Sequence, residues 1–147
     1  MLKWRVCTAM LAAAIMSASQ AGMAQAPPQR VPVDRSVVVG GVEVACTGIG
    51  KDARDDPRWK AFPIRVVFSD PAGDLVTDVT LTLSKPKGSP MLKVACAAPW
   101  VLLKLQPGTY EASARREHPG ATARTAVLHA PAHGQAVVNI TFPHAPG

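Results

Sequence analysis

Short runs in which apolar and polar residues alternate, separated by turn-forming residues, constrain the fold of this chain more than any other feature. In IRVVFS (64–69) every second residue is apolar, and a similar alternation runs through VTDVTLTL (76–83). A period of two is typical of half-buried antiparallel strands. The intervening SDPAGD (69–74) and SKPKGSP (84–90) are rich in Pro, Gly, Asp and Ser, so they are interpreted as hairpin connections.

Further runs extend this pattern to the end of the chain. They are MLKVAC (91–96), VLLKL (101–105), YEASAR (110–115), TARTAVL (122–128) and AVVNITF (136–142). Near the start, SVVVGGVEVAC (36–46) is β-branched, and its Gly40-Gly41 pair predicts either a bulged or a kinked first strand. Seven or eight short strands without a long helical pattern predict an all-β fold, an antiparallel β-sandwich, with a small barrel as the alternative.

The strand parities predict which side chains form the core of the sandwich. In VTDVTLTL (76–83), Thr77 is expected to face the core, and Asp78, Thr80 and Thr82 are expected to face solvent. Trp100 is expected to be the largest core side chain. The predicted core set is Val66, Phe68, Val79, Leu81, Leu83, Trp100, Leu103, Leu105, Tyr110, Ala112, Ala114, Ile140 and Phe142.

The amino-terminal residues predict a cleaved signal peptide. Lys3 and Arg5 form a basic region, and VCTAMLAAAIM (6–16) supplies an apolar stretch too short to span a membrane. Small residues place the cleavage after Ala24, with Ala26 as the alternative. The mature chain is therefore expected to be periplasmic or secreted, with no integral membrane segment.

The remaining chain is expected to divide into three parts. Residues 25–35 are rich in proline and predict an extended leader, and order is expected to begin at about Ser36. Residues 36–143 form the sandwich domain, and residues 144–147 form a flexible tail.

Two cysteines survive removal of the signal, Cys46 and Cys96. Because disulfides persist in oxidising compartments, the pair predicts a disulfide that closes a loop of about 50 residues and contributes about 4 kcal/mol. A metal or redox pair is disfavoured, since neither a CxxC motif nor a neighbouring histidine is present.

The segment 47–61, TGIGKDARDDPRWKA, interrupts the strand pattern. Charges at near-helical spacing predict a short helical turn, limited by Pro57. Trp59 and Phe62 are expected to anchor it to the body, although a ligand platform is the alternative.

The late histidines are the candidate metal ligands. His129 and His133 lie four residues apart in HAPAH and could bind copper or zinc, with His118 or His144 as a third ligand. Pro131 lies between them, which excludes a helical two-histidine motif, so no metal or other cofactor is predicted.

Catalytic motifs and nucleic-acid signals are both missing from the sequence. The serines occur without a GxSxG elbow, GIG is too short for a phosphate loop, and the acidic residues Asp52, Asp55 and Asp56 alternate with cations in a self-neutralised turn. Basic residues are scattered and have almost no aromatic neighbours, which disfavours nucleic acid as a partner. The chain is therefore predicted not to be an enzyme.

The stretch LQPGTY (105–110) is interpreted as a fold signature. Pro107 and Gly108 suit the central positions of a type II turn. Tyr110 then faces inward, and its hydroxyl is expected to bond to the backbone, as in a tyrosine corner.

Residues 48–142 resemble the carboxypeptidase regulatory-like domains, also called transthyretin-like or prealbumin-like, and especially small exported bacterial proteins of that type. The resemblance rests on GIGKDARDDPRWKAFPIRVVF, GDLVTDVTLTL, Pro99-Trp100 and LQPGTY. It implies a seven-stranded Greek-key sandwich that serves as an accessory or binding module. A transthyretin-like enzyme branch that hydrolyses a urate derivative ends in Tyr-Arg-Gly-Ser, whereas this chain ends in TFPHAPG.

The expected function is a non-catalytic exported module that binds a protein or a cell-envelope component. The alternatives are metal binding through the late histidines and carbohydrate binding, which would need exposed aromatic residues.

Overall fold

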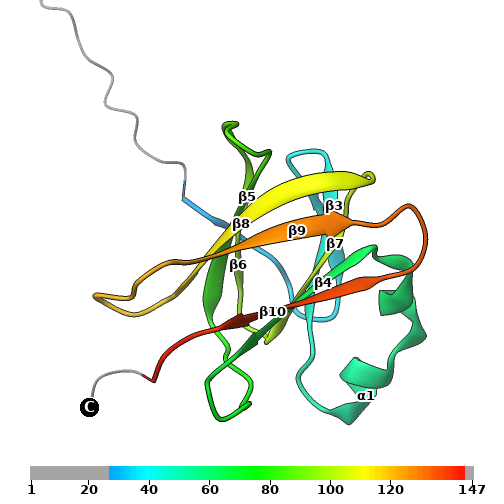
Figure 1. The fold of residues 1–147 in the computed structure, drawn as a ribbon. Helices are drawn as coiled ribbons and strands as arrows, with labels where there is room; N and C mark the ends of the chain where they lie inside the picture. Colours follow the sequence, from blue (N-terminus) through cyan, green and yellow to red (C-terminus); the bar gives the residue numbers. More distant parts are fainter. Residues whose placement is uncertain (1–26, 145–147) are drawn as a thin grey trace, which may run out of the picture.

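Two five-stranded sheets pack face to face in the computed structural model, which describes residues 27–144 (Figure 1). Sheet A contains, in spatial order, β1 (Gln29–Arg30), β6 (Pro90–Cys96), β5 (Val79–Ser84), β8 (Gly108–Arg116) and β9 (Arg124–Ala130). Sheet B contains β10 (Ala136–Thr141), β4 (Ile64–Ser69), β7 (Trp100–Lys104), β3 (Val42–Thr47) and β2 (Ser36–Val39). The predicted β-sandwich is confirmed. The predicted signal peptide, its cleavage site and the last three residues of the tail lie outside the described residues.

Most strand pairs are antiparallel, as predicted, but both sheets are mixed. β1 pairs with β6 in parallel, and β10 pairs with β4 in parallel, each at the edge of its sheet. β4 and β7 pair although the β5–β6 hairpin of the other sheet separates them in the sequence, and this crossing between the sheets gives the sandwich its Greek-key character.

The first apolar run is a hairpin, so the predicted bulge or kink within one strand is wrong. Gly40 and Gly41 have φ values of 56° and 78°, and Val39 pairs with Val42 on either side of them. Two consecutive residues with positive φ are what a two-residue type I′ turn requires, and such a turn reverses the chain between β2 and β3.

The predicted alternation also fails at the start of β5. Asp78 has a φ of 59°, and the strand begins only at Val79. This residue shifts the parity of the preceding chain, so that Val76 is buried and Thr77 is only half-buried. From Val79 onward the alternation is regular, and Thr80 and Thr82 face outward as predicted.

The core lies between the sheets and contains the predicted residues, with one exception. Trp100 is only 8 % exposed, but it lies on the outer face of sheet B, because its neighbours Val101 and Leu103 in β7 face the core. The guanidinium of Arg65 lies 4.4 Å from the centroid of the Trp100 ring. The prediction of Trp100 as a core residue is therefore wrong, although its burial is confirmed.

In the part of the leader that the structure describes, order begins before Ser36, so the predicted start of order is wrong. Gln29 and Arg30 pair with β6, and the backbone N–H of Val31 donates to the carbonyl of Ala95 at 3.0 Å. The buried side chain of Val31 joins the core, which explains why this proline-rich segment is held against sheet A.

The predicted disulfide is present and joins the two sheets. Cys46 in β3 and Cys96 in β6 are bonded, with their Cα atoms 5.7 Å apart and both side chains fully buried. Within residues 27–144, no helix is long and apolar enough to cross a membrane.

The stretch from 105 to 110 carries the chain from sheet B to sheet A. Gly108 has a φ of 149° and already pairs with Ala130 in β9, so the predicted type II turn, which needs φ near 80° at this position, is wrong. The predicted role of Tyr110 is confirmed, because its hydroxyl donates to the carbonyl of Gln106 at 2.8 Å while its ring is buried.

Candidate functional site

The outer face of sheet B is covered by a helical segment. α1 (Lys51–Asp55) and the 3₁₀-helix η1 (Pro57–Ala61) lie beside this sheet, as Figure 1 shows. Trp59 and Phe62 are each 4 % exposed and pack against Ala45 and Leu102 of the sheet. Both aromatic residues are anchors, as predicted, and their burial leaves no ring free for a ligand platform.

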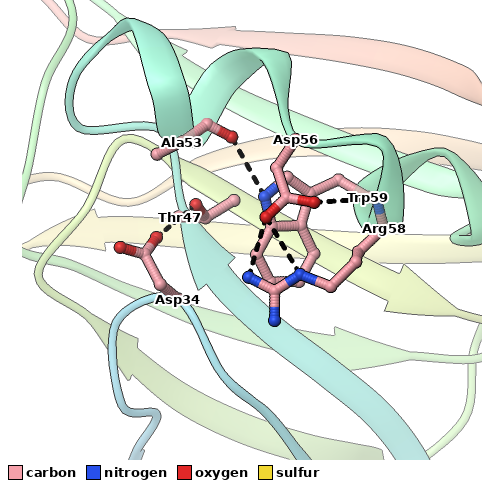
Figure 2. Close-up of polar contacts among 6 residues, drawn as sticks. All are labelled: Asp34, Thr47, Ala53, Asp56, Arg58 and Trp59. Atoms are coloured by element: carbon pink, nitrogen blue, oxygen red, sulfur yellow. Dashed lines mark hydrogen bonds and ion pairs between the residues drawn. The ribbon is translucent and has the colours of Figure 1, made fainter.

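We call the segment 51–61, which contains α1 and η1, the cover of sheet B. Hydrogen bonds hold the cover in place (Figure 2). The indole N–H of Trp59 donates to the carbonyl of Ala53 at 3.0 Å, and the backbone N–H of Arg58 donates to the Asp56 carboxylate at 2.9 Å. From the other side, the amide of Gln135 donates to the carbonyl of Trp59 at 2.7 Å and to that of Phe62 at 2.9 Å. The cover is therefore fixed to itself and to the loop before β10.

Ion pairs on the sheet B side explain the shifted pKa values found there. The side chain of Arg58 donates to Asp56 and lowers the pKa of that carboxyl group, while Asp56 raises the pKa of Arg58. Lys104 likewise lowers the pKa of Glu43, with their charged atoms 2.9 Å apart. The Arg58–Asp56 pair neutralises charge within the acidic turn, as predicted, and the Lys104–Glu43 pair neutralises charge on sheet B.

The outer face of sheet A, in contrast, carries rows of polar side chains. Paired residues in adjacent strands share a face, so the strand register defines each row. Thr82 of β5 pairs with Lys93 of β6 and Ser113 of β8, and Ser113 pairs in turn with Thr125 of β9. These four side chains form one continuous polar row across the sheet. We call its three hydroxyl-bearing members, Thr82, Ser113 and Thr125, the hydroxyl row.

The neighbouring rows differ in charge. On one side of the hydroxyl row, Thr80 pairs with Arg115. On the other side, Ser84 pairs with Glu111, which pairs with Val127. Positive and negative charge therefore lie on opposite sides of the hydroxyl row on the outer face of sheet A.

Two adjoining hollows occupy this face, and both are open to solvent. The first, of about 470 Å³, is lined by Lys93, Arg115, Arg116, His118 and the two threonines of β5. The second, of about 360 Å³, includes Ser84, Glu111 and Val127. Thr82 and Ser113 line both hollows, which therefore form one continuous open face along sheet A.

The first hollow is cationic. Among the described residues that line it, the one carboxylate is that of Glu117, which is 3.6 Å from Arg30 and is partly neutralised by it. Within the described part of the chain, Lys93, Arg115 and Arg116 belong to none of the ion pairs. These three cations are therefore available to an anionic ligand.

The four histidines do not assemble into one site, although His118 and His144 line a common hollow. His129 lies exposed on β9 with Nδ1 3.3 Å from the Thr109 hydroxyl, and His133 lies in the loop between β9 and β10. His118 borders the first hollow, and Nδ1 of His144 is 3.9 Å from a carboxylate oxygen of Asp70. Among residues 27–144, no group of three or more His, Cys, Asp or Glu side chains is close enough to hold a metal ion.

Sequence reasoning missed the cationic hollow because its members come from three strands. Lys93 and Arg115 are 22 positions apart in a chain whose basic residues look scattered, and only the register places both beside β5. The outward parity of Thr80 and Thr82 was the available signal. This signal could not show that none of the elements within residues 27–144 would cover the outer face of sheet A.

Comparison with known proteins adds no assignment. The chain matches no protein-family model, and no curated protein shows significant similarity to it.

Proposed function

We propose that this chain is a non-catalytic, exported module that binds a cell-envelope component through the outer face of sheet A. One observation carries this proposal: helices cover one outer face of the sandwich, whereas the other presents hydroxyls and cations around two joined hollows. Concave surfaces with convergent polar groups are where ligands bind most often.

The chemistry of the open face suits binding. Each hydroxyl of the hydroxyl row can donate and accept a hydrogen bond, and Lys93 adds a flexible positive charge. β5 and β8 are each paired on both sides, so the side chains are presented by a rigid sheet. Acyl or glycosyl transfer would need in addition an activated nucleophile or a suitably spaced pair of carboxylates.

The disulfide supports export, because such bonds form and persist outside the reducing cytosol. Together with the predicted signal peptide, it favours a periplasmic or secreted location. The proposed relationship to the carboxypeptidase regulatory-like domains rests on the sequence motifs, and the β-sandwich is the fold that it requires.

The test is cosedimentation of the purified mature protein with insoluble envelope material. Ser113→Trp would fill the junction of the two hollows, so we expect it to abolish cosedimentation. Val137→Trp adds the same bulk at an exposed position of sheet B and should sediment like the parent. Thermal unfolding of both variants verifies that they are folded.

Two results would overturn the proposal. One is that the parent protein does not sediment with envelope material. The other is that folded Ser113→Trp sediments as well as the parent and Val137→Trp do, because the open face would then contribute nothing to binding.

A further inference from the structure

We propose that the ligand of the open face is an acidic polysaccharide bearing carboxylates. Lys93 and Arg115 would bind the carboxylates, and the hydroxyl row would bind the sugar hydroxyls. This inference rests on the proposed function, because it names the ligand of the same face.

The position of the two cations favours an extended anionic ligand. Lys93 is on β6 and Arg115 is on β8, the two neighbours of β5. Adjacent strands are about 4.8 Å apart, which places these residues about 10 Å apart across the sheet. They pair with Thr82 and Thr80 respectively, so they are also offset along the strands. One polymer crossing the first hollow can therefore meet both charges at separate anionic groups.

The hydroxyls favour a sugar over a peptide. An extended peptide is commonly bound by main-chain pairing at a sheet edge, but the main chains of β5 and β8 already pair on both sides. Recognition on this face therefore depends on side chains. Thr80, Thr82, Ser113 and Thr125 offer hydroxyls that both donate and accept, which complements a ligand dense in hydroxyl groups.

The placement of the aromatic residues favours a charged sugar over a neutral one and over nucleic acid. Trp59, Trp100 and Tyr110 are all buried and none lies on the open face. Single-stranded nucleic acids bind largely through stacking on exposed rings, which these residues cannot provide. Charge and hydroxyl contacts are the interactions that remain.

The second hollow suits an uncharged part of the same ligand. Glu111 lies in this hollow and would repel a carboxylate. Val127, which is 53 % exposed, offers an apolar surface to the C–H groups of a sugar ring. The carboxylates are therefore expected over the first hollow only.

Calorimetry with oligogalacturonate tests the inference. We expect the mature protein to bind this probe, and we expect the affinity to fall as NaCl is raised because ion pairs are screened. Dextran of the same length, as a neutral sugar, and polyglutamate, as an acidic polymer without sugar, should not bind.

Charge-neutralising variants locate the binding. Lys93→Gln/Arg115→Gln removes both proposed carboxylate contacts and should weaken binding at least about tenfold, since hydrogen bonds between charged groups are the strong ones. Arg35→Gln/Lys60→Gln removes one arginine and one lysine at exposed positions outside the hollows. This matched control should bind within about twofold of the parent.

Three outcomes would overturn the inference: no binding of oligogalacturonate, equal affinity for polyglutamate, or the same loss in both double variants. These outcomes differ from failure of the proposed function. If Ser113→Trp abolishes cosedimentation while oligogalacturonate does not bind, the open face is a binding surface for a different ligand. If folded Ser113→Trp still cosediments, the binding surface itself is wrongly placed.

Discussion

The two outer faces of the sandwich are built from similar strands but differ in what covers them. On sheet B, Trp59 and Phe62 cover Leu102, and Arg65 covers Trp100. On sheet A, the corresponding outward positions carry hydroxyls and cations, and no helix or strand within residues 27–144 covers them. The outward apolar side chains Leu102 and Trp100 are thus protected by a helix or a long side chain, whereas most outward positions of sheet A are polar, with the exposed Val127 as an exception.

The difference has a simple origin in the chain. Between β3 and β4 the connection includes α1 and η1, which fold back onto sheet B. Within the hairpins of sheet A, short connections join the strands: residues 85–89 join β5 to β6, and residues 117–123 join β8 to β9. These connections leave the outer face of sheet A open. One inserted segment therefore decides which face contributes stability and which is available to a ligand.

Removing the disulfide should have the largest effect, because Cys46 and Cys96 join the sheets that carry both faces. We expect Cys46→Ala/Cys96→Ala to lower the free energy of unfolding by about 4 kcal/mol. Urea denaturation measures the loss, and hydrogen exchange should show that strands of both sheets are destabilised. Loss of protection in one sheet alone would indicate that the two faces unfold independently.

Trp59→Ala should break the covered face without affecting the open one. The truncation leaves Phe62 and Leu102 with a cavity, so we expect a loss of about 3 kcal/mol in the free energy of unfolding. The isosteric Thr82→Val on the open face should change it by less than about 0.5 kcal/mol. Equal losses in urea denaturation would contradict the distinction between the faces.

Gly48→Ala should lower the free energy of unfolding by roughly 2 kcal/mol, because it combines backbone strain with a steric clash. Gly48 has a φ of 108°, and an added Cβ would lie 2.8 Å from the Trp100 ring. Gly134→Ala is the matched control, since Gly134 has a φ of 77° but no atom near the added Cβ. In this control the free energy of unfolding should fall by only about 1 kcal/mol, as measured by thermal unfolding. Similar losses would show that Trp100 moves aside freely.

The smallest predicted effect concerns the charge pair of the cover. Arg58→Gln should raise the pKa of Asp56 toward the usual aspartate value, as measured by NMR titration. Because the pKa of Asp56 is lowered in the folded parent, its contribution to stability is present above the usual aspartate pKa and is lost as the pH falls through the lowered value. The part of the stability difference that comes from the charge pair should therefore disappear at low pH, whereas the loss of the Arg58 guanidinium from the Trp59 ring, 4.7 Å away, is the same at every pH. A difference that is the same at low and neutral pH would have a cause other than this charge pair.

The sequence alone determined the strands whose two faces differ in polarity. In β4 and most of β5, alternating apolar and polar residues define both the strand and its buried side, because the period of a strand is two. Local chemistry similarly predicted that the Tyr110 hydroxyl bonds to a backbone group, which is the carbonyl of Gln106, and the even number of exported cysteines predicted their pairing.

Tertiary structure decided what periodicity leaves open. β7 is apolar at Trp100 and Leu102 on one face and at Val101 and Leu103 on the other, so alternation could not show that Trp100 faces away from the core. The parallel pairing of β10 with β4 and the meeting of Lys93 and Arg115 beside β5 depend on contacts between segments far apart in the chain. Side-chain pattern fixes which face of a strand avoids water, but only packing decides which elements supply the apolar surroundings, and hence which face of the sandwich stays open.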